Sequence, residues 1–183
     1  LADIGQALLH CPQQHDVGGS AQRDRGADDL ESGVESGLGP DRRDIYDGFE
    51  QTLEKTAYPA FWGHDAKTVE TIAQTVKHYL SPLSQAQEGR SLRRPDVLWP
   101  RAGRLLLAER LRLNTQKVVA IRLPKPALSN VWWSFAPKPE VSDATEKALS
   151  LWLNSTLGLL ILLANRDETE GAWVDFKKPT LYA

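Results

Sequence analysis

The sequence predicts an α+β domain, in which a small mixed or antiparallel twisted sheet packs with a C-terminal helix pair and follows a flexible N-terminal segment. Strand-like segments separated by turn residues fill the middle of the chain, and apolar residues recur at helical intervals towards its end. The first 39 residues contain few core-forming side chains. A chain of 183 residues suits one domain plus a tail. We therefore divide it into an N-terminal helix and linker, 1–39, and a domain, 40–183.

The N-terminal segment starts with a short apolar stripe. Leu1, Ile4 and Leu8 share one face of a helix over residues 1–11. Residues 12–39 then contain six glycines and few sizeable aliphatic side chains. Such a stretch cannot bury enough apolar surface to offset the entropy of ordering it. We expect a flexible linker there.

The first part of the domain mixes helical and strand patterns. Ile45, Phe49 and Leu53 stand at four-residue spacing, which predicts a helix through all three. The aromatic and turn residues of 58–66 predict a packed loop or a short strand. Residues 67–80 fit either a helix or strands, because their apolar positions suit a helix and their β-branched content suits strands.

Two neighbouring segments predict a β-hairpin. Residues 117–123 and 127–135 are rich in β-branched, aliphatic and aromatic residues, and Pro124 and Pro126 between them indicate a turn. The preceding residues, 104–113, fit either a helix or a strand.

The second strand of this hairpin contains adjacent tryptophans, Trp132 and Trp133. Neighbouring residues of a strand face opposite ways, so one ring enters the core and the other points outward. The outward ring either forms a stacking or interface surface or is covered by the N-terminal part of the chain. We favour the covered arrangement.

A helix pair follows the strands. Asp143 and Glu146 have the spacing of a capping box, and Asn154-Ser155 separates the first helix from a second, 156–164. The apolar stretch from 148 to 164 has 17 residues and includes polar ones, so a buried helix pair is expected rather than a membrane span.

The second helix is apolar throughout. We expect Leu157, Leu160, Ile161 and Leu163 to be mostly buried. We expect Gly158 to let the helix approach a neighbour closely. A last strand is predicted over 171–176.

The net charge of −2 is the sum of an acidic N-terminal segment and a basic central segment. Residues 1–54 carry 12 acidic and 4 basic side chains, whereas residues 90–125 carry 10 basic and 2 acidic ones. Most of these bases are arginines, whose guanidinium groups recognise phosphate and guanine edges with two hydrogen bonds. The basic segment therefore predicts an anionic partner, although a solvated face carrying both signs would explain the composition as well.

The sequence contains few signatures of catalysis. The sequence contains no GxGxxG, GxxxxGK[ST], HExxH or GxSxG motif. The single cysteine, Cys11, excludes an internal disulfide and a cysteine-based zinc site. A weak nuclease pattern, Asp41 with Asp65 and Lys67, could hold Mg²⁺ and activate water. With no apolar run of transmembrane length, we expect no membrane partner and a cytoplasmic location.

The C-terminal segment LWLNSTLGLLILLANRDETEGAWVDFKKPTLYA resembles the C-terminal target recognition domains of adenine-specific (N6) DNA methyltransferases from restriction-modification and phage-defence systems. Leu153-Asn154-Ser155, Leu157-Gly158, Trp173 and Lys178-Pro179-Thr180-Leu181 match the pattern of that family. The resemblance extends over residues 38–183, and residues 1–37 do not fit it. It implies a mixed α and β module that reads DNA.

The resemblance also implies that DNA recognition and methyl transfer belong to separate domains. In such proteins a separate upstream methyltransferase domain binds S-adenosylmethionine and carries an Asn/Asp-Pro-Pro-Tyr/Phe motif, and this chain contains neither a Gly-rich cofactor loop nor a Pro-Pro pair. We therefore expect no cofactor in this chain and no methyl transfer by the chain alone. Its start at Leu1 and its lack of methionine suggest a fragment of a longer protein.

The expected partner is double-stranded DNA. Arg and Lys of residues 101–125 would contact phosphates, and Arg110, Arg112, Asn114 and Gln116 would read base edges. The full set of expected DNA-binding residues is Arg101, Arg104, Arg110, Arg112, Asn114, Gln116, Lys117, Arg122, Lys177 and Lys178. Two alternatives remain open: a protein-interaction domain that docks a partner through a Trp-rich surface, and a Mg²⁺-dependent nuclease.

Overall fold

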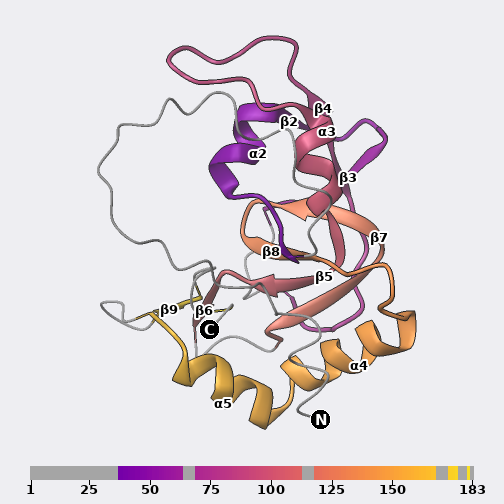
Figure 1. The fold of residues 1–183 in the computed structure, drawn as a ribbon, viewed down its shortest axis with the longest axis vertical. Helices are drawn as coiled ribbons and strands as arrows, with labels where there is room; N and C mark the ends of the chain where they lie inside the picture. Colours follow the sequence, from indigo (N-terminus) through magenta and orange to yellow (C-terminus); the bar gives the residue numbers. More distant parts are fainter. Residues whose placement is uncertain (1–36, 64–68, 113–117, 168–172, 177–180, 182–183) are drawn as a thin grey trace, which may run out of the picture.

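A computed structural model describes residues 37–63, 69–112, 118–167, 173–176 and 181. Its central feature is a seven-stranded sheet with the order β1-β8-β5-β7-β3-β4-β2 (Figure 1). Neighbouring strands are antiparallel except for β3 and β7, which are parallel, so the sheet is mixed. The strands are β1 (Gly37–Leu38), β2 (Phe49–Thr52), β3 (Tyr58–Phe61), β4 (His78–Pro82), β5 (Gly103–Ala108), β7 (Ala120–Ser129) and β8 (Trp132–Ala136).

In Figure 1, α2 and α3 lie above the central strands, α4 and α5 lie below them, and a small second sheet lies beside α5. The second sheet pairs β6 (Arg110–Arg112) with β9 (Trp173–Asp175) in antiparallel fashion. The helical elements are α2 (Arg42–Gly48), α3 (Pro95–Leu98), the 3₁₀ turn η2 (Trp99–Arg101), α4 (Asp143–Leu153) and α5 (Thr156–Ala164). The expected α+β fold with a C-terminal helix pair is confirmed. The predicted helix over 1–11 and residues 12–36 of the linker predicted over 12–39 fall outside the described residues. The last residues of that linker are predicted wrongly, because Gly37–Leu38 form β1 against β8 and Leu38 is buried.

Alternating side chains of β5 and β8 face two of the three hydrophobic clusters that the described residues form. Leu105 and Leu107 of β5 face a cluster that includes α4 and α5, whereas Leu106 faces a cluster on the other side of the sheet. Trp133 and Trp132 divide in the same way, and both rings are buried. Both tryptophans are therefore covered, as expected, and the Phe61 ring of β3 packs against the Trp132 ring, with 5.8 Å between their centroids. Residues 1–36 of the N-terminal part lie outside the described residues.

The predicted hairpin turn at the prolines is wrong. β7 continues through Pro124 and Pro126, and β5 lies between β7 and β8 in the sheet. The Leu105–Arg122 pair is followed by Gly103–Ala127, so four residues of β7 lie opposite one residue of β5. Both prolines stand in this bulge, where the missing N–H of proline breaks no ladder hydrogen bond.

The helix predicted through Ile45, Phe49 and Leu53 is too long. α2 ends at Gly48, Phe49 starts β2, and Leu53 is 74% exposed. A spacing of four residues also fits the two-residue period of a strand. Pairing of Phe49 with Pro82 of β4 places the Phe49 ring in the core, and this tertiary contact decides between the two patterns.

The helix pair starts and breaks where the sequence predicts. Ser142 Oγ accepts a hydrogen bond from the Thr145 N–H at the start of α4, and Ser155 Oγ accepts one from the Gly158 N–H at the start of α5. A Cβ atom on Gly158 would lie 2.2 Å from the carbonyl oxygen of Trp152, so the close approach expected at this glycine is confirmed.

The burial predicted for α5 is wrong at three of its four positions. Leu157 and Leu160 are each 58% exposed and Ile161 is 43% exposed, whereas Leu162 is only 7% exposed. Since α5 is apolar all round, its sequence does not mark the face that packs on the sheet. Within the described residues, no single helix is long and apolar enough to cross a membrane. Only α4 and α5 taken together reach that length, and they are bent by 73° where they meet.

Candidate nucleic-acid interface

Folding neutralises much of the basic segment. Among the described residues, six of the ten basic residues in 90–125 form ion pairs with acidic side chains. Two of these acids, Asp44 and Asp47, come from the acidic N-terminal part of the chain. The simple pairs are Arg90–Asp47 at 3.0 Å, Arg93–Asp44 at 3.3 Å, Arg94–Asp96 at 2.6 Å and Arg110–Asp175 at 3.1 Å; Arg104 and Arg122 pair with acids of α4.

Arg104 and Arg122 belong to an ion cluster under the first turns of α4. Arg104 Nη2 donates to Glu146 Oε2 at 3.1 Å, and Arg122 Nε donates to Glu146 Oε1 at 3.0 Å. The Glu146 side chain is only 4% exposed, and both arginines also pair with Asp143. A hydrogen bond from Lys147, with both arginines nearby, lowers the pKa of Asp143 below its ordinary value. The cluster ties α4 to β5 and β7, and it engages two of the guanidinium groups expected to contact DNA.

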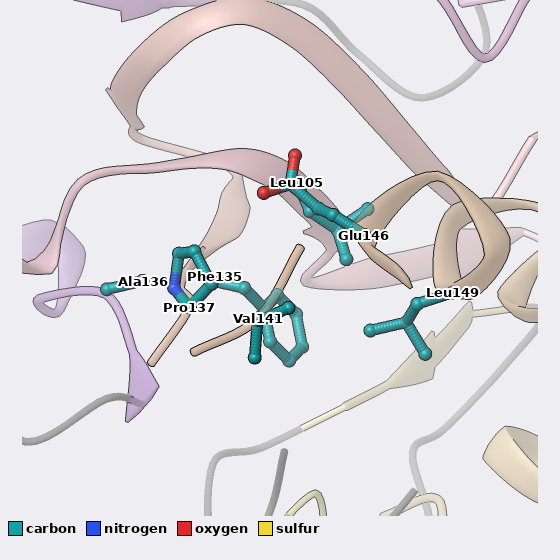
Figure 2. Close-up of a pocket in the computed structure, with 7 residues that line it drawn as sticks. All are labelled: Leu105, Phe135, Ala136, Pro137, Val141, Glu146 and Leu149. Atoms are coloured by element: carbon teal, nitrogen blue, oxygen red, sulfur yellow. The ribbon is translucent and has the colours of Figure 1, made fainter. Parts of the chain in front are cut away.

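Glu146 also borders a small pocket between β8 and the start of α4 (Figure 2). The remaining lining is apolar and consists of Leu105, Phe135, Ala136, Pro137, Val141 and Leu149. Both carboxylate oxygens of Glu146 already accept hydrogen bonds from arginine. The pocket therefore presents apolar walls and a carboxylate engaged in structural contacts.

The two-stranded sheet forms a ribbon with one apolar and one polar face. Leu111 of β6 and its partner Val174 of β9 are buried in the core that α4 and α5 share. Because side chains alternate along a strand, Arg110 and Arg112 lie on the other face. On that face Arg110 lies opposite Asp175, and Arg112 lies opposite Trp173. We call these four residues, Arg110, Arg112, Trp173 and Asp175, the ribbon face.

The two arginines of the ribbon face are held differently. The Arg110 side chain is 64% exposed and its Nε lies 3.1 Å from Asp175 Oδ1. The Arg112 guanidinium lies over the ring of Trp173, 5.7 Å from its centroid, which is a cation–π arrangement. Trp173 was recognised in the sequence only as part of the family pattern, because the strand partner of Arg112 depends on a pairing between distant segments.

The ribbon is anchored to the main sheet next to Glu109. The Phe176 N–H donates to the Glu109 carbonyl oxygen at 2.9 Å, and Trp133 Nε1 donates to the Phe176 carbonyl oxygen at 2.8 Å. Burial raises the pKa of the Glu109 side chain above its ordinary value, and the nearby Arg110 opposes this shift. An acidic group that is easier to protonate than usual therefore lies next to the ribbon face.

The other expected site residues are dispersed or outside the described ranges. Arg101 is exposed at the end of η2, away from the ribbon in the chain. Asn114, Gln116, Lys117, Lys177 and Lys178 fall outside the described residues, as do Asp65 and Lys67 of the nuclease pattern. Among the residues that the structure does describe, no group of three or more His, Cys, Asp or Glu side chains could hold a metal ion.

Comparison of the chain with protein-family models, with curated proteins and with solved structures found no match.

Proposed function

We propose that this chain is a double-stranded-DNA target-recognition module and that the ribbon of β6 and β9 carries its main contacts. One observation supports this above the others. Seven of the ten expected DNA-binding residues belong to this ribbon or directly follow its strands in the chain: Arg110 and Arg112 in β6, Asn114, Gln116 and Lys117 after β6, and Lys177 and Lys178 after β9.

A ribbon of this kind has suitable dimensions and chemistry for DNA. The major groove of B-DNA admits a two-stranded β-ribbon, and arginine pairs with the O6 and N7 atoms of guanine. The Arg110 side chain is 64% exposed, whereas its partner Asp175 is only 17% exposed, so the pair lies at the edge of the core. A guanidinium group has five N–H donors, so Arg110 can keep its Nε beside Asp175 and still donate to a phosphate or a guanine edge. The Trp173 ring beneath Arg112 restricts its guanidinium before DNA arrives.

Arg104 and Arg122 are not part of this proposal, because Glu146 and Asp143 already engage them. The resemblance of residues 38–183 to target recognition domains of adenine-specific DNA methyltransferases supports a DNA-reading role. On the same basis we propose that S-adenosylmethionine binding and methyl transfer belong to a companion methyltransferase domain. The alternative of a partner docked on exposed tryptophans has less support, since Trp132 and Trp133 are buried.

The test is a fluorescence anisotropy titration of duplex DNA with the 183-residue chain at several salt concentrations. Each phosphate contact should contribute about −0.9 to the slope of log affinity against log salt. Arg110→Ala should weaken binding and flatten this slope by about one unit if Arg110 meets a phosphate.

Arg94→Ala is the matched control. Arg94 is also an exposed arginine paired with one aspartate, Asp96, and it lies next to α3 at the opposite end of the molecule from the ribbon (Figure 1). Both variants remove one positive charge, so a general charge effect would weaken binding equally in both. Equal weakening, or DNA binding without salt dependence, would refute the ribbon as the DNA-contacting surface.

A further inference from the structure

The described structure leaves one apolar surface open on α5. Leu157, Leu160 and Ile161 are each at least 43% exposed, and their spacing places them in one stripe along the helix. No residue of α5 carries a charge. We call these three residues the α5 stripe. Leucine and isoleucine side chains gathered in this way mark a surface to which another apolar element docks.

The size of the α5 stripe favours an occupant from the same chain. Nine helical residues span about 13 Å, and a helix is about 10 Å wide. A stable interface between separate proteins buries about 800 Å² on each partner, far more than such a stripe offers. A segment tethered to the same molecule is present at an effective concentration on the order of millimolar, so a small surface is sufficient to hold it.

The N-terminal end of the chain has a complementary pattern. Leu1, Ile4 and Leu8 recur at helical intervals, and a helix carrying them extends about 10 Å between the first and the last. The α5 stripe and this stripe are therefore of similar length. Residues 1–11 contain no lysine or arginine and a single acid, Asp3, so few charges would be buried on contact.

The connection to the domain is made on the same side of the sheet as α5. The N-terminal residues join the described structure at β1, and Leu38 of β1 belongs to the same hydrophobic cluster as Leu162 of α5. Residues 12–36 provide 25 residues of Gly-containing connection. A flexible chain of this length has an r.m.s. end-to-end distance of about 25–30 Å. This reach is sufficient to cross the face of a domain of this size.

We propose that residues 1–11 form an amphipathic helix that packs through Leu1, Ile4 and Leu8 against the α5 stripe. This inference is independent of the proposed DNA-binding role, because the α5 stripe and the ribbon face share no residue. It assigns to the N-terminal segment an intramolecular docking site on the helix pair.

The single cysteine of the chain makes the proposal testable, because Cys11 ends the proposed helix and accepts one spin label. In NMR spectra of the full chain, the label should broaden the methyl signals of Leu157, Leu160 and Ile161. The methyl signals of Leu53 serve as the control, since Leu53 is 74% exposed and follows β2, at the edge of the sheet opposite to β1. They should keep their line widths.

Two matched variants separate specific docking from random proximity. Ile4→Glu places a charge in the N-terminal stripe, whereas Gln6→Glu places the same charge on the opposite side of that helix. The first should abolish the broadening on α5, and the second should retain it. Leu160→Glu changes an exposed side chain, so the fold should persist while the broadening is lost.

Three results would overturn the proposal. The broadening could be absent from the parent chain, or it could persist in the Ile4→Glu variant. It could also arise only between a spin-labelled chain and a separate isotope-labelled chain, which would make a second copy the occupant of the α5 stripe.

Discussion

The side-chain amide of Asn154 pairs with both backbone groups of Ala120. Its Nδ2 donates to the Ala120 carbonyl oxygen at 2.7 Å, and its Oδ1 accepts from the Ala120 N–H at 3.2 Å. The same oxygen accepts from the Val119 N–H at 2.7 Å, and the same nitrogen donates to the Ser150 carbonyl oxygen at 2.7 Å. The amide thus joins the end of α4 to the start of β7, which gives the Leu-Asn-Ser segment a structural role.

Asn154→Ala should lower the free energy of unfolding by about 2–4 kcal/mol, because the polar backbone groups left without a partner cost about 1–3 kcal/mol each. Urea denaturation measures this loss. The control is Asn165→Ala, since Asn165 is exposed and its amide makes one hydrogen bond, to the Ile161 carbonyl oxygen within its own helix turn. That change should cost no more than about 0.5 kcal/mol. Similar losses in the two variants would contradict the structural role of Asn154.

Glu146→Ala should be among the most destabilising single changes in the domain. It would leave Arg104 and Arg122 with only the more exposed Asp143 as a common partner in a part-buried site. Removing one member of a buried ion pair typically costs about 3–5 kcal/mol. Glu140→Ala, at an exposed position in the turn before α4, should change stability by less than about 0.5 kcal/mol. Thermal and urea unfolding of both variants would compare them, and a loss below about 1 kcal/mol for Glu146→Ala would show that the cluster contributes little.

Features fixed by neighbouring residues were predictable from the sequence, and features fixed by distant partners were not. The boundaries of α4 and α5 follow from Ser142, Ser155 and the local apolar pattern, and the structure confirms them. The capping-box spacing of Glu146 suggested a local role, yet its partners come from β5 and β7. No local pattern signals such a long-range pairing.

The sequence also could not predict which arginines of the basic segment remain available for DNA. Arg110 and Arg112 stand out in the sequence as part of a basic segment, but composition cannot tell them from Arg104 and Arg122. The difference arises because β6 pairs with β9, whereas β5 and β7 meet α4. The β7–β8 hairpin was predicted wrongly for a related reason, since the insertion of β5 between two consecutive strands depends on the whole sheet.

Replacing leucine by alanine should lower the free energy of unfolding much more on the buried side of α5 than on its exposed side. Leu162→Ala should cost about 2–5 kcal/mol, because Leu162 is 7% exposed and its loss leaves a cavity in the core beneath the helix pair. Leu160→Ala should cost less than about 1 kcal/mol, because Leu160 is 58% exposed. The two changes delete the same atoms from the same helix, so each controls for the helix propensity of the other. Equal losses in urea denaturation would place both side chains in the core and contradict the orientation of α5.

Glu109 should make stability depend on pH. Burial raises the pKa of Glu109 in the folded state above the ordinary value of 4.5, so its ionised form opposes folding. This cost is fully present above the folded-state pKa and disappears as the pH falls towards 4.5. Glu109→Gln should therefore be more stable than the parent at pH 7, and the difference should shrink as the pH is lowered towards 4.5.

Urea denaturation of the parent and of Glu109→Gln across this pH range measures the effect. Glu88→Gln, a change of an exposed side chain in a loop, is the control and should follow the parent at every pH. A Glu109→Gln variant that is less stable than the parent at pH 7 would mean that the ionised carboxylate stabilises the fold.

Arg112 and Lys117 should contribute differently to DNA binding. The Arg112 guanidinium is oriented over Trp173, which suits a contact that requires defined geometry, such as two hydrogen bonds to one guanine. Arg112→Ala should then reduce discrimination between DNA sequences by about 1–3 kcal/mol.

Lys117, which lies outside the described residues, is expected from the sequence to contact a phosphate. Lys117→Ala should weaken binding to all duplexes alike and flatten the salt slope by about one unit. Anisotropy titrations with a panel of duplexes at several salt concentrations separate the two effects, and an Arg112→Ala variant that weakens every duplex equally would make Arg112 a phosphate contact.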